Sequence, residues 1–310
     1  MQQRKFIHYL IISLKGMAMG AADVVPGVSG GTIAFISGIY EELLTSISSI
    51  NIATLKLLKT DGVKAVWKVI NGNFLLALLI GIFVSIISLA KLISWLLENK
   101  PIMVWSFFFG LVLASIIYIG KQITKWNFIT FVAFFIGIVL AYYITTLQPL
   151  ISENSSPLFM FLAGAIAICA MILPGISGAF ILVLLGAYKP ALEAIHNRDF
   201  KIIAILVFGA IVGLLSFSKV LKWLFANYKN YTLALLTGFI LGSLNKIWPW
   251  KETLTWRVNS HGIKVPFNEQ SISPLSFEGD AQLAMAILLS VIGFSVIILL
   301  ERVANNSSNA

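Results

Sequence analysis

The chain has 310 residues, of which 58% are hydrophobic and only 11% are charged, and its mean hydropathy is +0.92. Soluble domains hold roughly 45–50% apolar and about 25% charged residues, so the composition excludes a water-soluble protein with one buried core. The net charge of +9 is spread between apolar stretches and forms no basic, aromatic-interleaved patch, which argues against nucleic acid as a partner. The composition predicts an all-α polytopic membrane protein.

Long apolar stretches follow one another along most of the chain. A membrane-spanning helix needs about 20 mostly apolar residues, and the clear candidates are 74–97, 102–120, 127–147, 201–226, 230–248 and 281–300. Two further apolar regions, 8–47 and 157–195, are broken near their middle by a Pro-Gly turn. Each is predicted to form two short helices, as a re-entrant hairpin or as a pair of spans. Together the stretches give ten helical segments. No role is predicted for the polar loop 249–280.

The sequence contains an internal duplication. Residues 16–40 align with 164–188 at a constant offset of 148, with nine of 25 positions identical, and further matches follow at an offset of 128. The duplication divides the chain into 1–150 and 151–310, each with one broken hairpin and three spans. The first half has in addition an extra lysine-bearing segment within about 48–72. Five segments are an odd number, so the second copy enters the membrane from the opposite side. This predicts a 5+5 inverted-topology repeat, as in many secondary transporters.

The basic residues predict the orientation of the chain. If the N-terminus is cytoplasmic, thirteen Lys and Arg residues lie on the cytoplasmic side and eight on the other side. Cytoplasmic loops carry the excess of positive charge, so we expect both termini in the cytoplasm.

The cysteine and histidine residues give no sign of a metal site. Cys169 is the only cysteine, and His8, His196 and His261 are far apart in the sequence without ligand spacing. We therefore expect no disulfide within the chain, no bound metal and no cofactor.

A Pro-Gly-x-Ser-Gly motif stands in the middle of each broken region. Proline ends the preceding helix and glycine allows a tight turn, while serine caps the next helix, whose free amides attract anions. We predict that the turns are formed by Pro26, Gly27, Pro174 and Gly175. The predicted binding residues for an anionic substrate are Ser29, Gly30, Gly31, Thr32, Ser177 and Gly178. The alternative is a packing kink whose small residues allow close helix contact.

The duplication also predicts how the two turns lie in space. Because the copies are inverted, the hairpins should approach one another from opposite faces of the membrane. Ser29 and Ser177 should then lie close together near its middle.

Five charged residues near the broken regions and span ends are further candidates. Asp23 directly precedes the first turn, and an intramembrane carboxylate is by default a functional hypothesis. Asp23 and Glu41 are therefore candidates for proton coupling, the alternatives being pairing of Asp23 with Lys15 and an interfacial position for Glu41. Lys15, Lys91 and Lys219 are candidate auxiliary phosphate contacts, whereas snorkelling to the interface is the alternative for Lys91 and Lys219.

The two motifs resemble those of the bacterial polyprenyl-phosphate transporter family, formerly a membrane family of unknown function. The resemblance rests on 15–16, 20–32 and 38–41 in the first copy, and on 171–178 with 186 and 188 in the second. Phe180 and Lys189 depart from the pattern of the first copy.

The resemblance implies a translocase, not an enzyme, whose partners are the membrane and a polyprenyl phosphate lipid. It implies that undecaprenyl phosphate crosses the bacterial cytoplasmic membrane and returns to the cytoplasmic face for cell-wall polymer synthesis. No oligomeric state is predicted.

Two other functions remain open from the sequence. One is an ion-coupled permease for a small water-soluble anion. The other is a membrane phosphatase for polyprenyl pyrophosphate, although no arginine follows the turn serines and no histidine is placed as a base.

Overall fold

The computed structural model describes residues 5–25, 27–150, 155–258 and 264–308. Helices form most of the chain, and one antiparallel hairpin joins strand β1 (Lys251–Val258) to β2 (Lys264–Ser271). The helices in chain order are α1 (Phe6–Val24), α2 (Gly30–Ile36), α3 (Tyr40–Ser48), α4 (Ile52–Thr60), α5 (Gly62–Val69), α6 (Gly72–Asn99), α7 (Pro101–Gly120), α8 (Phe128–Thr146), α9 (Pro157–Ile172), α10 (Gly178–Leu184), α11 (Tyr188–His196), α12 (Phe200–Asn227), α13 (Lys229–Gly242), the 3-10 helix η1 (Leu244–Ile247) and α14 (Leu283–Ser308).

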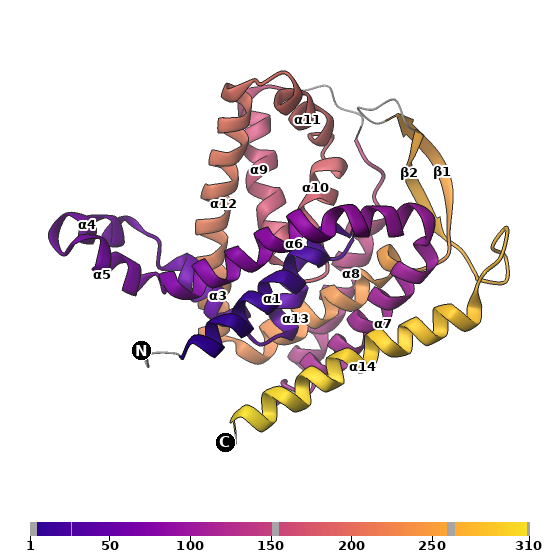
Figure 1. The fold of residues 1–310 in the computed structure, drawn as a ribbon, viewed down its shortest axis with the longest axis horizontal. Coiled ribbons are helices and arrows are strands. Elements are labelled where there is room, and N and C mark those ends of the chain that lie inside the picture. The colour runs from indigo at the N-terminus through magenta and orange to yellow at the C-terminus, as the bar shows by residue number, and fades with distance from the viewer. Residues whose placement is uncertain (1–4, 26, 151–154, 259–263, 309–310) are drawn as a thin grey trace.

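The expectation of a purely α-helical chain is wrong in one region. The polar loop 249–280 contains the β1–β2 hairpin, which lies beyond the helices at one end of the molecule (Figure 1). The extra segment within 48–72 forms α4 and α5, which project from the opposite end (Figure 1). Both elements therefore lie outside the main helical body.

The predicted spans correspond to helices of unequal length. Four helices, α6, α7, α8 and α12, are long and apolar enough to cross a membrane, within the residues that the structure describes. The predicted span over 230–248 corresponds to two elements, α13, which ends at Gly242 after 14 residues, and the 3-10 helix η1. The side chain of Asn245 accepts a hydrogen bond from Thr145 at 2.9 Å, and Pro249 cannot continue a helix.

Each broken region contains three helices instead of the predicted two. The first comprises α1, α2 and α3, and the second comprises α9, α10 and α11. Besides the Pro-Gly turn, each region has a second break at a glycine, Gly38 or Gly186, and both glycines have φ +74°. This left-handed backbone favours glycine. The two glycines occupy matching positions of the duplication, so the second break also has a signal in the sequence.

The same helix pairing occurs twice in the molecule. α1 packs along α6, and in the same way α9 packs along α12. Likewise α8 packs along α13, and α14 packs along α7. The close approaches also correspond: Gly81 faces the backbone of Ser13, and Gly209, at an offset of 128, faces the backbone of Phe161, at an offset of 148. Side chains larger than hydrogen would separate these helices, which is why small residues recur at such crossings.

The short helix α2 lies in the interior of the protein. All seven of its residues are buried. The ring of Phe35 at its end packs edge-to-face on Tyr40, with 4.8 Å between the centroids, and both rings contact Phe225 of α12. This packing fixes the first Pro-Gly turn against the centre of the molecule.

Candidate functional site

The glycines of the two Pro-Gly turns have similar backbone conformations. Gly27 has φ +83° and Gly175 has φ +93°, a region that residues with a side chain rarely occupy. α9 ends at Ile172, just before Pro174, as the motif predicts. Pro26 itself lies outside the described residues.

The two turns contact each other directly through hydrogen bonds. The hydroxyl of Ser29 donates to the carbonyl oxygen of Met171 at 2.9 Å. The backbone N–H of Gly175 donates to Thr32 Oγ1, also at 2.9 Å. The buried hydroxyl of Tyr40 donates to the carbonyl oxygen of Ile172 at 3.1 Å. All three side chains in these bonds belong to the first copy.

The first motif directs most of its polar groups inward. The N–H of Gly30 donates to Asp23 Oδ1 at 2.6 Å, and the N–H of Gly31 donates to Ser29 Oγ at 3.1 Å. Ser29, Gly30, Gly31 and Thr32 are all buried. In this conformation these residues join the two broken regions and cap α2.

The Thr32 contact gives a prediction about stability. Thr32→Val keeps the shape of the side chain but leaves the buried N–H of Gly175 without its acceptor, which costs about 1–3 kcal/mol. We expect a lower melting temperature for the purified protein in detergent, whereas Thr60→Val, at an exposed threonine of α4, should melt like the wild type. Equal melting temperatures for Thr32→Val and wild type would contradict the role of this bond.

A cavity of about 710 Å³ lies beside the second turn. Its walls come from both turns, the end of α8, the loop after it, η1 and the β1–β2 hairpin. The lining residues with polar or charged side chains are Asp23, Tyr142, Thr145, Thr146, Gln148, Ser177, Tyr188, Asn245, Lys246, Lys251, Glu269, Gln270 and Ser271. Of the predicted site residues, Asp23, Gly27 and Ser177 line this cavity. Ser177 makes no capping hydrogen bond with its side chain.

Two lysines in this cavity were not among the predicted site residues. The Lys246 Nζ lies 4.6 Å from the ring centroid of Phe180. The Lys251 Nζ lies 3.7 Å from the ring centroid of Trp105 on α7 and 3.9 Å from Glu269 Oε2. Cations over aromatic faces are held electrostatically, so both ammonium groups are positioned by rings within the protein.

Burial controls the protonation of Lys251. Its side chain is only 9% exposed. Desolvation lowers the pKa of Lys251 from the usual 10.5 to about 8, which the charge of Glu269 opposes and that of Lys246 reinforces. A second anion in the cavity would stabilise the ammonium form.

The other predicted charged residues lie outside the cavity lining. Lys15 Nζ donates to the carbonyl oxygen of Ser37 at 2.6 Å. Lys91 and Lys219 are exposed on α6 and α12. Glu41 forms an exposed ion pair with Lys229 at 2.7 Å. Gly178 is buried in the contact between α10 and α9, where an added Cβ would meet the backbone of Ala167.

The chain is similar to known proteins over most of its length. The model of the undecaprenyl phosphate translocase-like family matches residues 19–265. A polyprenyl-phosphate transporter of Vibrio cholerae is 50% identical over 304 residues, covering 97% of this chain and 98% of the relative. The chain belongs to this family.

A more distant relative covers less of the chain. A polyprenyl-phosphate transporter of Staphylococcus aureus is 34% identical over 266 residues, covering 80% of this chain and 88% of the relative. No solved structure matches the chain significantly. The range matched by the translocase-like family model includes both Pro-Gly turns, Lys246 and Lys251, and it ends before α14. The predicted resemblance to polyprenyl-phosphate transporters is confirmed.

Proposed function

We propose that this protein is a transporter, and not an enzyme, that moves undecaprenyl phosphate across the bacterial cytoplasmic membrane. The observation that carries the proposal is the 710 Å³ cavity, which combines Ser177, Lys246 and Lys251 at the side of a bundle of apolar helices. A phosphate needs hydrogen-bond donors and positive charge, and an isoprenoid chain needs apolar surface. The names of the two relatives agree with this chemistry.

Within this proposal the phosphate binds among Ser177, Lys246 and Lys251. Four of the predicted binding residues instead join the hairpins in this conformation: Ser29, Gly30, Gly31 and Thr32. Gly178 allows α10 to pack closely on α9. Ser177 differs from Ser29 because its hydroxyl faces the cavity without a capping bond. Asp23, which also lines the cavity, is the group that takes up a proton with the anion.

We further propose that 1–150 and 151–310 are inverted repeats, with re-entrant hairpins and both termini in the cytoplasm. The twofold occurrence of the same helix pairs and glycine contacts supports this arrangement. In that orientation the loop after α8 and the β1–β2 hairpin lie outside the cytoplasm. The cavity between them then receives the carrier lipid from the outer leaflet, and transport runs inward to recycle it.

A liposome experiment tests the function. Vesicles containing only this protein should move undecaprenyl phosphate between leaflets faster than protein-free vesicles, as measured by a leaflet-resolved assay of the lipid phosphate. Uptake of inorganic phosphate that is unaffected by added undecaprenyl phosphate would instead indicate a permease for a small anion. Release of phosphate from undecaprenyl pyrophosphate would indicate a phosphatase.

The low pKa of Lys251 predicts a pH dependence of binding. Only the ammonium form attracts the phosphate, so affinity should fall as pH rises through about 8 and approach a tenfold loss per pH unit. Lipid binding should be titrated between about pH 7.5 and 9.5, where the phosphate is already a dianion. Lys251→Arg keeps its charge throughout and should remove the decline, so a decline of equal size in that variant would contradict the assignment.

Stability should change in the opposite direction over the same pH window. The folded-state pKa of Lys251, about 8, is below the usual 10.5, so the unfolded chain binds more protons between these values. The free energy of unfolding therefore increases as pH rises from about 8, which means that the folded protein becomes more stable. A loss of binding in this window cannot then be attributed to unfolding through Lys251.

A further inference from the structure

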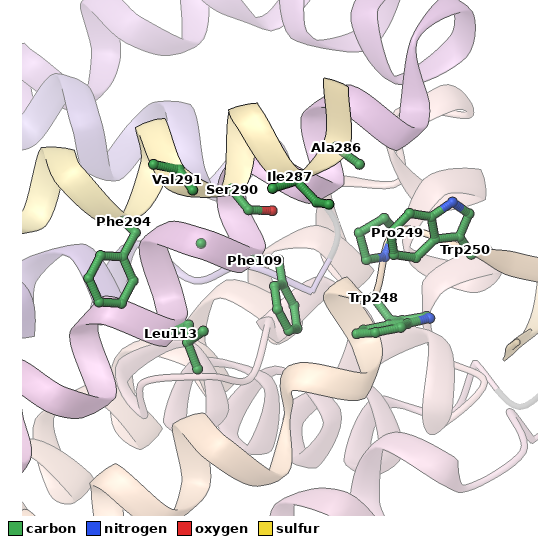
Figure 2. Close-up of a pocket in the computed structure, with 11 residues that line it drawn as sticks. Phe109, Leu113, Trp248, Pro249, Trp250, Ala286, Ile287, Ser290, Val291 and Phe294 are labelled. Atoms are coloured by element: carbon green, nitrogen blue, oxygen red, sulfur yellow. The ribbon is translucent and has the colours of Figure 1, made fainter. Parts of the chain in front are cut away.

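A second, apolar groove lies between α7 and α14, with a volume of about 320 Å³. Figure 2 shows its lining: Phe109 and Leu113 come from α7, and a row of side chains comes from α14, while Trp248, Pro249 and Trp250 close one end. The complete lining is Phe109, Gly110, Leu113, Trp248, Pro249, Trp250, Ala286, Ile287, Ser290, Val291 and Phe294.

The polar atoms of the groove already have partners within the protein. Trp248 Nε1 donates to the carbonyl oxygen of Ile272 at 2.8 Å, and Trp250 Nε1 donates to that of Ala281 at 2.9 Å. The hydroxyl of Ser290 donates to the carbonyl oxygen of Ser106 at 2.9 Å. None of the lining residues is charged. The groove therefore offers apolar contact, and its best occupant is a hydrocarbon.

A short segment of the chain connects this groove with the polar cavity. Lys246 and Lys251 line the cavity, whereas Trp248, Pro249 and Trp250, which stand between them in sequence, line the groove. The rings of Trp248 and Trp250 are in contact, with 5.4 Å between their centroids. The two sites therefore lie on either side of six consecutive residues.

One face of α7 makes the same connection. Trp105, Phe109 and Leu113 are spaced four residues apart and so lie along one face of the helix. Trp105 contacts the Lys251 ammonium, Phe109 packs edge-to-face on Trp248 at 5.4 Å, and Leu113 lines the far part of the groove. An apolar path thus begins at the cavity lysine and runs along α7.

The groove is accessible from the outer surface of α14. Ile287 is 61% exposed and Val291 is 56% exposed, and both line the groove. On a bundle of apolar helices this surface is expected to face lipid tails, so a chain can enter the groove sideways from the bilayer.

We propose that the α7–α14 groove binds the part of the isoprenoid chain next to the phosphate while the phosphate occupies the cavity at Lys246 and Lys251. The inference rests on the proposed function and adds a chain-binding subsite to it. Its volume suits a short stretch of the chain, and the remainder stays in the bilayer. The transporter then recognises a phosphate and its attached isoprenoid together, which distinguishes its substrate from inorganic phosphate and from phosphates on other lipids.

Filling the groove tests this proposal. The double variant Ile287→Trp/Val291→Trp places two large rings over the lining from exposed positions. We expect it to bind undecaprenyl phosphate at least about tenfold more weakly, because each excluded methylene contributes about 0.8 kcal/mol, which is roughly fourfold in affinity. Binding of methyl phosphate, which has no isoprene unit to place in the groove, should equal that of the wild type. Both ligands are titrated in the same detergent.

The neighbouring residues of α14 provide a matched control. Leu288 and Ile292 are 52% and 43% exposed but do not line the groove, so Leu288→Trp/Ile292→Trp should bind both ligands like the wild type. Undiminished binding of undecaprenyl phosphate by the groove variant would overturn the subsite while leaving the proposed function intact. Equal weakening of both ligands would also overturn it. Failure of the wild type to bind undecaprenyl phosphate would refute the proposed function itself.

Discussion

Replacing Lys251 with glutamine should weaken the binding of undecaprenyl phosphate by roughly 10- to 100-fold. A hydrogen bond to a charged group contributes about 1.5–3 kcal/mol, and the ammonium of Lys251 is almost completely removed from water. Lys246→Gln should have an effect of similar size, and the double variant should lose transport in liposomes. Binding is measured by titration of the lipid, and transport by the leaflet-resolved assay.

Two controls separate lost charge from lost folding. Glu269→Gln removes the acid that lies 3.9 Å from Lys251 Nζ. At a pH well below the pKa of Lys251, where the lysine stays charged without this acid, the variant should keep or strengthen lipid binding, because the phosphate no longer competes with a carboxylate. Lys201→Gln, at an exposed lysine of α12, should bind like the wild type. If Lys201→Gln weakened binding as much as Lys251→Gln, the phosphate site would not be this cavity.

Asp23→Asn should abolish the dependence of transport on a pH gradient while preserving lipid binding. Asp23 lines the cavity, where a carboxylate would repel a bound phosphate. If the carboxyl group takes up a proton with the anion outside and releases it in the cytoplasm, an acidic exterior drives inward transport. The amide of asparagine resembles the protonated acid, so the variant should translocate lipid at the same rate with and without an imposed gradient.

The choice of asparagine also preserves the local structure of the first turn. Asp23 Oδ1 accepts a hydrogen bond from Gly30 N–H at 2.6 Å, and an amide oxygen can accept the same bond. Asp23→Ala cannot, and it should additionally lower the melting temperature by leaving that N–H without its partner. A gradient response in Asp23→Asn equal to that of the wild type would exclude the proton role and leave Asp23 as a structural cap.

The positions of the long helices and of the first helix breaks could be predicted from the sequence. Runs of apolar residues long enough for a bilayer marked α6, α7, α8 and α12 almost to the residue. The Pro-Gly pairs marked the first break of each broken region, because proline removes a backbone donor and glycine permits a positive φ. The second breaks lie at Gly38 and Gly186, which match in the duplication, but no break was predicted there from the sequence.

The sequence could not show which of the two motifs joins the broken regions and which lines the cavity. Ser29 and Ser177 occupy equivalent positions, yet Ser29 bonds to the carbonyl oxygen of Met171 while Ser177 faces the cavity. The difference depends on which groups surround each turn after folding, since Thr32 can accept a bond from Gly175 and its counterpart Phe180 cannot. Local sequence specifies a turn, whereas its partners come from distant parts of the chain.

Only the tertiary structure brought Lys246 and Lys251 to the site. In the sequence Lys246 stands near the end of the predicted span 230–248 and Lys251 stands in the polar loop that follows, and neither pattern marks them as binding residues. In the fold, α13 ends early at Gly242, and the segment after it crosses between the second turn, α7 and the β1–β2 hairpin. Burial then lowers the pKa of Lys251, and its ammonium lies over the ring of Trp105. Hydrophobicity along a chain determines which segments enter the membrane, but contacts between segments determine which charges face one another.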